Sequence, residues 1–269
     1  MRFGLGVAAV LGLSLAAAKL AMMASPATPV ANGAAQSDQL REVNTALIPA
    51  PRLEMDSYDW YQRHDEILAL QKKMDPQVVL IGDSITHFWA GEPKSARVSG
   101  PKAWEEAFGG LRVLNMGFGW DRTQNVLWRL REGEFEGLHP KTVVINIGTN
   151  NLTGTANARS NSPEEIVPGI LAIVEEVRKR SPESRIIVMG VFPRGYAAGN
   201  DYRAPILKIN ELLGKALAGR PNTAFLDIGE KFLAPDGTLP TAMMDDGTHP
   251  TEAGYAIWAK ALVEAGVRK

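Results

Sequence analysis

Short apolar runs alternate with longer segments of mixed polarity along most of this chain. The runs are rich in Val and Ile, and their length and composition are typical of strands that are buried on both faces. The first run, Val78-Val79-Leu80-Ile81, leads directly into the turn sequence Gly-Asp-Ser. We predict strands at five positions: 78–81, 112–115, 142–148, 185–191 and 223–227.

The segments around these runs place apolar residues three and four positions apart, a spacing that predicts amphipathic helices. These segments are 60–73, 104–108, 123–131, 163–180, 204–218 and 251–265. We expect the first of them to end before Asp75-Pro76, because proline cannot continue a helix. Alternating strands and helices predict an α/β fold, here a three-layer sandwich around a five-stranded parallel sheet in flavodoxin-like order.

The N-terminus has the features of a secretory leader. Arg2 precedes an apolar run, and small residues and prolines follow it up to Ala35. We expect residues 1–35 to direct export to the periplasm or the extracellular space. An uncleaved membrane anchor is the alternative, because residues 3–24 approach the length that spans a bilayer if Lys19 is tolerated.

The next segment is expected to be a linker, which we place at residues 36–57. The stretch up to about Pro51 is rich in Ala, Pro, Asn and Ser and has no apolar periodicity, so it has no core of its own. The folded domain is therefore predicted to comprise residues 58–269, and too few residues remain for a second domain.

Composition excludes several functional classes. A formal net charge of -1 leaves no basic surface for nucleic acid. The chain has no cysteine, which excludes disulfides, thiolate metal sites and a cysteine nucleophile. The four histidines lack the spacing of metal ligands, and no glycine-lysine loop for phosphate occurs, so we expect neither a metal nor a cofactor.

The hydroxyl of Ser84 is the first candidate for chemistry. It follows the first predicted strand, and ligands of open α/β sheets bind at the carboxyl ends of the strands. A serine on such a turn can act as a nucleophile, although serine is also a common cap for a following helix. Nucleophilic chemistry at this position requires a base, a carboxylate that orients the base, and donors for an oxyanion.

Two further stretches lie where other predicted strands end. Residues 115–121 contain two glycines that can turn the chain and present backbone N–H groups. Residues 146–152 carry the adjacent amides of Asn150 and Asn151, which can aim an NH₂ group at an oxyanion. Taken alone, the first stretch is more typical of a simple turn, and the second of a capped loop.

His249 is the candidate general base, because imidazole accepts a proton near neutral pH. Its second nitrogen needs a carboxylate, which Asp246 can supply from three residues earlier on a loop that contains glycine. Asp245 competes for this role, and a loop aspartate is by itself more typical of an Asx turn.

Together these stretches resemble the sequence blocks of the SGNH or GDSL hydrolase superfamily. The matching blocks are Gly82-Asp83-Ser84, the 115–121 loop, Gly148-Thr149-Asn150-Asn151 and Asp246-Gly247-Thr248-His249, in the family's order and spacing. Residues 114–151 and Phe192-Pro193-Arg194-Gly195 are similar to the catalytic subunits of type Ib platelet-activating-factor acetylhydrolase. The resemblance covers about residues 60–262 and implies the SGNH hydrolase fold.

The resemblance implies a role for each matching residue. Ser84 would be the nucleophile, His249 the general base and then the general acid, and Asp246 the partner that orients the imidazole. The oxyanion donors would be the backbone N–H of Ser84, a backbone N–H of the 115–121 loop and the side-chain amide of Asn150.

The chain departs from the family pattern at one oxyanion donor. Trp120 stands directly before the loop aspartate, where the family usually has glycine. Its backbone N–H can still donate, but its bulky side chain needs allowed dihedral angles and would reshape the acyl pocket. Gly119 is the alternative donor.

We therefore expect an exported serine ester hydrolase that removes short acyl groups, above all acetyl, from a carbohydrate or another small ester, with no cofactor. A lysophospholipase or thioesterase is the alternative, and it would need an apolar channel. An inactive relative that binds glycans or a partner chain is a third reading. The related acetylhydrolase subunits dimerise, which suggests a homodimer here.

Other polar residues are expected to be structural. His87 follows Ser84 too closely in sequence to serve as its base. We expect four others to be exposed to water: His64, His139, Arg122 and Arg194. For the two arginines the alternative is a position near the cleft, where they would favour polar or anionic parts of a substrate.

Overall fold

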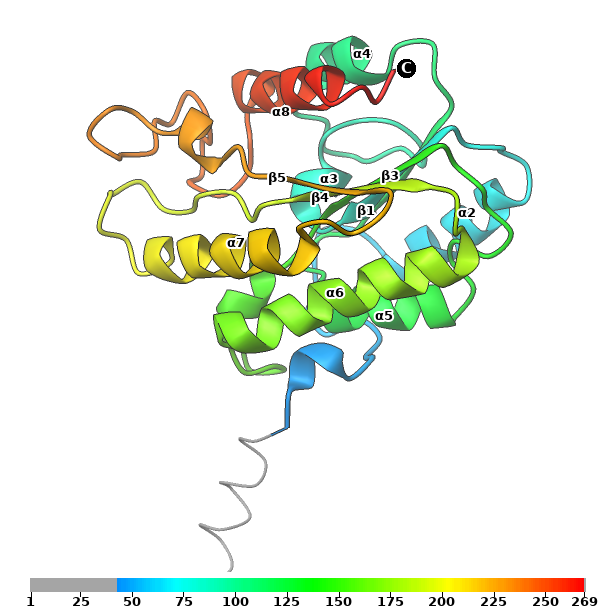
Figure 1. The fold of residues 1–269 in the computed structure, drawn as a ribbon, viewed down its shortest axis with the longest axis horizontal. Helices are drawn as coiled ribbons and strands as arrows, with labels where there is room; N and C mark the ends of the chain where they lie inside the picture. Colours follow the sequence, from blue (N-terminus) through cyan, green and yellow to red (C-terminus); the bar gives the residue numbers. More distant parts are fainter. Residues whose placement is uncertain (1–42, 269) are drawn as a thin grey trace, which may run out of the picture. The chain divides into compact units, whose positions relative to one another are not determined.

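Five parallel strands form one sheet at the centre of the protein (Figure 1). The structure is a computed structural model, and it describes residues 43–268. The strands are β1 (Val78–Gly82), β2 (Val113–Gly117), β3 (Thr142–Asn146), β4 (Arg185–Met189) and β5 (Thr223–Leu226). Their order in the sheet is β2-β1-β3-β4-β5, which confirms the predicted α/β sandwich with its flavodoxin-like order.

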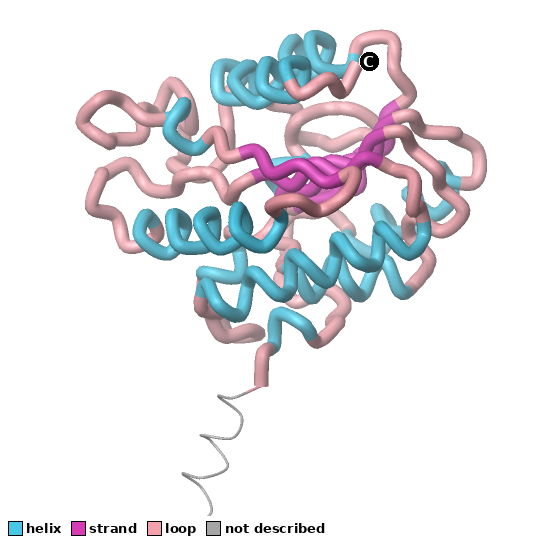
Figure 2. Tube along the Cα trace, viewed as in Figure 1, coloured by secondary structure: helices cyan, strands magenta, loops and turns pink. Residues whose placement is uncertain are grey.

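Helices cover both faces of the sheet, so the strands form the middle layer (Figure 2). One face packs against α2 (Trp60–Gln71), α5 (Thr123–Arg131), α6 (Pro163–Arg180) and α7 (Arg203–Leu217), and the other against α4 (Pro101–Phe108) and α8 (Glu252–Glu264). In β1, Val79 and Ile81 point into the first layer, whereas Val78 and Leu80 point into the second. All four side chains are buried, which explains why this strand has no polar position.

The C-terminal helix α8 is fixed against the segment that follows β1. The ring of Trp258 on α8 stacks on Trp89 with 4.4 Å between centroids. The hydroxyl of Tyr255, also on α8, donates a hydrogen bond to the carbonyl of Ile85, 2.7 Å away. Because Ile85 follows Ser84, this bond ties the helix that comes after His249 to the turn that carries Ser84.

Every predicted helix and strand occurs, with shifts of a few residues at the ends. The short elements are η1 (Thr45–Leu47), α3 (Ser84–His87), η2 (Asn150–Leu152) and η3 (Gly229–Phe232). Helix α2 ends two residues earlier than predicted. The N–H groups of Lys73 and Met74 both donate to the carbonyl of Leu70, which makes a tight turn that stops the helix before Asp75-Pro76.

Part of the expected linker belongs to the folded domain, whose compact unit begins at Val43. Ala46 is buried, and its carbonyl accepts a 2.8 Å hydrogen bond from the hydroxyl of Thr123. The side-chain amide of Asn125 donates to the carbonyl of Pro51 at 2.7 Å. The prediction that residues 43–57 only link was wrong, because polar side chains at the start of α5 bind this segment through its backbone.

The predicted leader or anchor, residues 1–35, lies outside the described residues. Among residues 43–268, the helices are all too short or too polar to cross a bilayer.

Candidate active site

The nucleophile candidate Ser84 is the first residue of the short helix α3, directly after β1. Asp83 caps this helix by accepting a 2.9 Å hydrogen bond from the N–H of Ile85. The helix lies so close to the strand ends that a Cβ added to Gly117 would come within 2.3 Å of the backbone nitrogen of His87. A Cβ on Gly82 would lie 2.1 Å from the hydroxyl oxygen of Thr86 on the same helix. Glycine at both strand ends therefore allows α3 to sit directly on the sheet edge.

His249 meets Ser84 across 165 residues of sequence. Its Nε2 lies 2.8 Å from the hydroxyl oxygen of Ser84, and its Nδ1 lies 2.6 Å from Oδ2 of Asp246. The other carboxylate oxygen of Asp246 accepts the backbone N–H of His249 at 2.7 Å. The structure thus brings the three predicted residues together, and it places Asp246 rather than Asp245 against the imidazole.

The electrostatics of Asp246 suit a carboxylate that stays charged. Partial burial alone would raise the pKa of Asp246, but hydrogen bonds from the backbone and ring of His249 outweigh it, so the pKa is lowered. A charged carboxylate on Nδ1 fixes the imidazole tautomer that leaves Nε2 free to accept the Ser84 proton.

The loop that carries His249 is held by the segment after β4. The hydroxyl of Tyr196 donates to the carbonyl of Asp245 at 2.7 Å. The N–H of Gly195 donates to the carbonyl of Gly247 at 2.8 Å. These contacts fix the loop of the base relative to the carboxyl edge of the sheet.

The predicted oxyanion loop is a tight turn closed by a 3.2 Å hydrogen bond from the N–H of Asp121 to the carbonyl of Phe118. Trp120 occupies its third position with φ of 64°, the left-handed conformation that a type II turn reserves for glycine. Its side chain is 38% exposed. The departure from the family pattern is therefore a strained tryptophan at the mouth of the site.

The third predicted donor, Asn150, lies against the same loop. Its side-chain amide donates to the carbonyl of Asp121 at 3.0 Å. Within residues 43–268, the backbone N–H groups of Ser84, Gly119 and Trp120 have no protein acceptor. All the predicted donors therefore come from the carboxyl edge of the sheet, but the structure does not distinguish Gly119 from Trp120.

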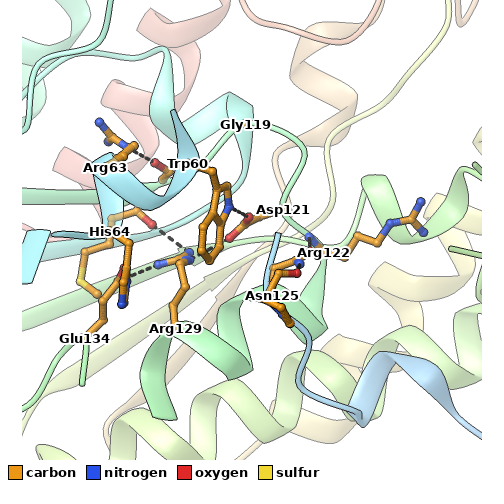
Figure 3. Close-up of polar contacts among 12 residues, drawn as sticks. Trp60, Arg63, His64, Gly119, Asp121, Arg122, Asn125, Arg129 and Glu134 are labelled. Carbon is orange, nitrogen blue, oxygen red and sulfur yellow. Dashed lines mark hydrogen bonds and ion pairs between the residues drawn. The ribbon is translucent and has the colours of Figure 1, made fainter. Parts of the chain in front are cut away.

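A buried polar network lies beneath this loop (Figure 3). The indole N–H of Trp60 and the Nε of Arg129 each donate to the carboxylate of Asp121 at 2.8 Å. Arg129 also pairs with Glu134, whose second oxygen lies 2.7 Å from Nδ1 of His64. Arg129 reaches two buried carboxylates, and its own guanidinium is fully buried. The network fixes Asp121, and hence the end of the oxyanion loop, from below.

Two sequence predictions about polar residues were wrong. His64 is buried rather than exposed, because it pairs with Glu134 between α2 and the end of α5. Arg122 is also buried, and its guanidinium donates to the carbonyls of Thr153, at 2.7 Å, and Arg159, at 3.2 Å. Charged neighbours in sequence do not reveal such long-range acceptors.

His87 was predicted not to be the base, and its surroundings agree with that. Its ring meets the Tyr58 ring edge to face at 4.6 Å between centroids. Burial, helped by the charges of Arg63 and Arg129, lowers the pKa of His87 to about 2. The buried, uncharged ring of His87 is therefore a packing residue beneath the site.

The buried carboxyl of Asp83 lies directly before Ser84. One oxygen caps α3, while the other has no hydrogen-bond partner among residues 43–268. Burial raises the pKa of Asp83 to about 7, against the opposing hydrogen bond from Ile85. This carboxyl therefore titrates near neutral pH, next to the nucleophile.

No group of three or more His, Asp or Glu side chains that could hold a metal ion occurs in the part of the chain that the structure describes. The chemistry that the arrangement can perform is attack by an activated hydroxyl, with donors around the developing oxyanion.

Sequence reasoning missed the residues that support the site. Arg129 carries one signal that could have found it, because it falls on the apolar face of its predicted helix, three residues after Val126. A charged residue on an apolar face indicates a buried ion pair. Phe88 and Arg97, which surround the exposed side of Asp246, carry no such signal. Their loop has no apolar periodicity.

Comparison with known proteins identifies the family. The model of the GDSL-like Lipase/Acylhydrolase family matches residues 80–257. The platelet-activating factor acetylhydrolase IB subunit alpha1 of Homo sapiens is 38% identical over 222 residues, which are 82% of this chain and 89% of that protein. Subunit alpha2 of Rattus norvegicus is 36% identical over 222 residues, which are 82% of this chain and 90% of that protein.

A solved structure of lower identity shares the fold. The acetylxylan esterase of Geobacillus stearothermophilus has a TM-score of 0.55 at 22% sequence identity, over 70% of this chain and 93% of that one. The relatives and the family model agree with the four sequence blocks. The chain belongs to the GDSL-like lipase/acylhydrolase family, a family of esterases.

Proposed function

We propose that this acylhydrolase is a serine ester hydrolase with Ser84 as nucleophile, His249 as general base and Asp246 as the orienting carboxylate. One observation carries the proposal: the continuous contacts from the Ser84 hydroxyl to Nε2 of His249, at 2.8 Å, and from Nδ1 to Asp246, at 2.6 Å. A serine hydroxyl is a weak nucleophile until a base accepts its proton. These contacts supply that base and fix its tautomer.

The reaction proceeds in two halves. Ser84 Oγ attacks the ester carbonyl while Nε2 of His249 takes the hydroxyl proton. The C–O bond to the alcohol then breaks, and the imidazolium returns the proton to the leaving oxygen, which leaves an acyl-serine. In the second half His249 takes a proton from water, the resulting hydroxide oxygen attacks the acyl carbon, and the acid departs as Ser84 regains its proton.

The negative charge on the carbonyl oxygen is greatest in the tetrahedral intermediates. The backbone N–H of Ser84, the amide of Asn150 and one N–H of the Gly119-Trp120 peptide pair would donate to that oxygen. Such fixed donors typically lower the barrier by about 2.7–4 kcal/mol each. Support for this role comes from the hydrogen bond of Asn150 to the oxyanion loop, which holds two of the donors in one unit.

We propose a short acyl group, above all acetyl, as the group removed. Trp120 stands next to the oxyanion loop where the family usually has glycine, and a bulky side chain there leaves less room for a long chain. The names of the relatives include a platelet-activating factor acetylhydrolase subunit and an acetylxylan esterase, both of which act on acetyl esters by name. The substrate proposed on this basis is an ester of a carbohydrate or another small ester.

A series of p-nitrophenyl esters from acetate to octanoate tests both claims. We expect turnover that is highest with acetate and falls as the chain lengthens, and we expect Ser84→Ala to abolish it while the circular dichroism spectrum is unchanged. Constant turnover up to octanoate would instead indicate an apolar channel, as in a lysophospholipase or thioesterase. Full activity in Ser84→Ala would refute the assignment of the nucleophile.

We also propose that the protein is exported, on the basis of the leader-like sequence at residues 1–35. Fractionation of bacterial cells that express the full chain, followed by intact mass measurement, tests this. A shortened chain in the periplasm or medium supports a cleaved leader, and a full-length chain in the membrane fraction supports an anchor. A full-length chain in the cytoplasm contradicts both.

A further inference from the structure

Arg97 lies on the open side of the Asp246–His249 pair, in the loop between α3 and α4. One terminal nitrogen of its guanidinium is 3.7 Å from Oδ2 of Asp246, the oxygen that also meets the imidazole. The other terminal nitrogen is 3.7 Å from Oδ1 of Asp245. The cation is therefore shared between the carboxylate that orients the base and a second carboxylate beside it.

Arg97 also reaches the imidazole through an aromatic ring. Its guanidinium carbon lies 4.9 Å from the centroid of the Phe88 ring, within the range of a cation–π contact. The Phe88 ring in turn lies 5.3 Å from the ring of His249. The base His249 is therefore linked to Arg97 by two routes. One runs through the carboxylate of Asp246, and the other runs through the ring of Phe88.

The guanidinium is held in place by its own loop. Its Nε donates to the hydroxyl of Ser99 at 3.2 Å. The backbone N–H of Ser99 donates to the carbonyl of Phe88 at 2.8 Å, and that of Gly100 to Trp89 at 3.2 Å. Because Phe88 ends the helix that begins at Ser84, the position of the cation is tied to that of the nucleophile.

Because Asp246 is partly exposed, a cation beside it can help to hold its carboxylate in place. The Asp246 side chain is 43% exposed and that of His249 is 20% exposed, so water can compete for the carboxylate. A cation on the open side holds the carboxylate toward the imidazole. It also places a positive charge near the imidazole, beside the negative charges of Asp245 and Asp246.

The other titratable groups around the base are Asp83, Tyr255 and Tyr196, whose hydroxyl donates to the carbonyl of Asp245. Asp83 is buried beneath Ser84, and the hydroxyl of Tyr255 donates to the carbonyl of Ile85. None of these side chains contacts the imidazole directly. Among the described residues, Arg97 is the one cation within salt-bridge distance of the carboxylate that orients the base.

We propose that Arg97 is a positioning residue that holds Asp246 on His249 and sets the lower pH limit of hydrolysis by its charge. The proposal rests on the proposed function of Ser84, His249 and Asp246. It concerns the geometry and protonation of the base, and it gives Arg97 no contact with the substrate.

The test compares pH profiles of kcat/KM for p-nitrophenyl acetate among four variants, one of them a matched control, and the wild type. In Arg97→Gln we expect the acidic limb of the profile to move to higher pH by about 0.5 pH unit, because the loss of a nearby positive charge in partly aqueous surroundings makes protonation of the imidazole easier. At neutral pH we expect kcat to fall about five- to tenfold, with KM changed by less than about twofold, because a misplaced base slows chemistry more than binding.

Two further variants separate charge from packing. Arg97→Lys keeps the positive charge and should restore most of the pH profile. Asp245→Asn removes a neighbouring negative charge, so it should move the acidic limb in the opposite direction, to lower pH. Arg112→Gln is the matched control, because Arg112 is an exposed arginine that pairs with Asp75 at the amino edge of the sheet, and its profile should equal that of the wild type.

An Arg97→Gln profile that superimposes on the wild type would overturn the proposal, as would a change confined to KM, which would indicate substrate binding instead. An acidic limb that moves the same way in Arg97→Gln and Asp245→Asn would also overturn it. NMR titration of the His249 ring in the same variants measures, without substrate, how each substitution changes the protonation of the imidazole. A wild type without esterase activity would refute the proposed function, and the NMR shifts would still test the effect of Arg97 on the imidazole.

Discussion

The side-chain amide of Asn150 donates a 3.0 Å hydrogen bond to the backbone carbonyl of Asp121. This contact joins the loop after β3 to the turn after β2, so the residue proposed as one oxyanion donor also holds the turn proposed to supply another. Loss of Asn150 should therefore affect the transition state more than the binding of substrate.

Asn150→Ala tests this coupling. We expect kcat for p-nitrophenyl acetate to fall about 10²–10³-fold with little change in KM, the typical effect of removing one oxyanion donor. Asn157→Ala is the control, because Asn157 is an exposed asparagine that donates to Glu54 away from the base, and it should keep full activity. A fall of less than about threefold in Asn150→Ala would remove this amide from the oxyanion hole.

Trp120→Gly should make the protein more stable while it changes the substrate range. A tryptophan at φ of 64° stores about 1–3 kcal/mol of strain, and glycine loses about 0.5–1 kcal/mol through its greater freedom when unfolded. We expect the free energy of unfolding to rise by about 1 kcal/mol, and activity toward butyrate and hexanoate esters to increase relative to acetate. Urea denaturation and the ester series measure the two effects.

Trp120→Ala separates strain from bulk. Alanine removes the indole but keeps a Cβ in the left-handed conformation, so it should widen the substrate range without stabilising the fold. Lower stability in Trp120→Gly than in Trp120→Ala would contradict the role of strain.

Asp83→Asn should reduce the change of the free energy of unfolding with pH. Burial raises the pKa of Asp83 in the folded state to about 7, from an ordinary value of 3.8. Between these values the folded state holds a proton that the unfolded state has released. Stability from this group is therefore fully present below about pH 4 and is lost as the pH rises through 7.

Asparagine at position 83 cannot ionise and still caps α3. We expect the difference in unfolding free energy between variant and wild type to change across pH 4–7 and to be constant above it, by urea denaturation at a series of pH values. Asp65→Asn, at an exposed position on α2, is the control with no such trend. A pH-independent difference for Asp83→Asn would show that Asp83 is ionised throughout.

Arg129→Met should greatly lower the free energy of unfolding of the domain. Arg129 is fully buried and pairs with both Asp121 and Glu134, so its removal leaves two buried carboxylates without their cation. We expect a loss of about 3–5 kcal/mol in the free energy of unfolding. Arg131→Met on the same helix replaces an exposed arginine and should change stability by less than about 0.5 kcal/mol. Equal effects of the two substitutions would rule out the network as a stabilising element.

The sheet and the catalytic blocks could be predicted from sequence because both have local signals. The run of four apolar residues at 78–81 identifies β1, and the order of the blocks around Ser84, Asn150 and His249 identifies the family. Parallel strands place their carboxyl ends at one edge, so the strand prediction also predicted that the blocks of Ser84 and Asn150 meet. His249 does not directly follow a strand, so its position was implied only by the resemblance.

Apart from Arg129, the supporting residues could not be predicted, because their roles depend on contacts between distant segments. His64 contacts Glu134 across 70 positions, and Thr123 contacts Ala46 across 77, and no sequence pattern links the members of either pair. The choice of Asp246 over Asp245 likewise depends on how one loop folds. The left-handed conformation of Trp120 follows from the turn, whereas its residue type argues against it.

The central claim is that the hydroxyl of Ser84 becomes acylated during turnover. Labelling of the wild-type protein with a fluorophosphonate, followed by mass spectrometry of the peptides, tests it most directly. The account predicts one adduct per chain, on Ser84, that forms much more slowly in His249→Ala. An adduct on another residue, or labelling of Ser84 at the same rate without the imidazole, would contradict it.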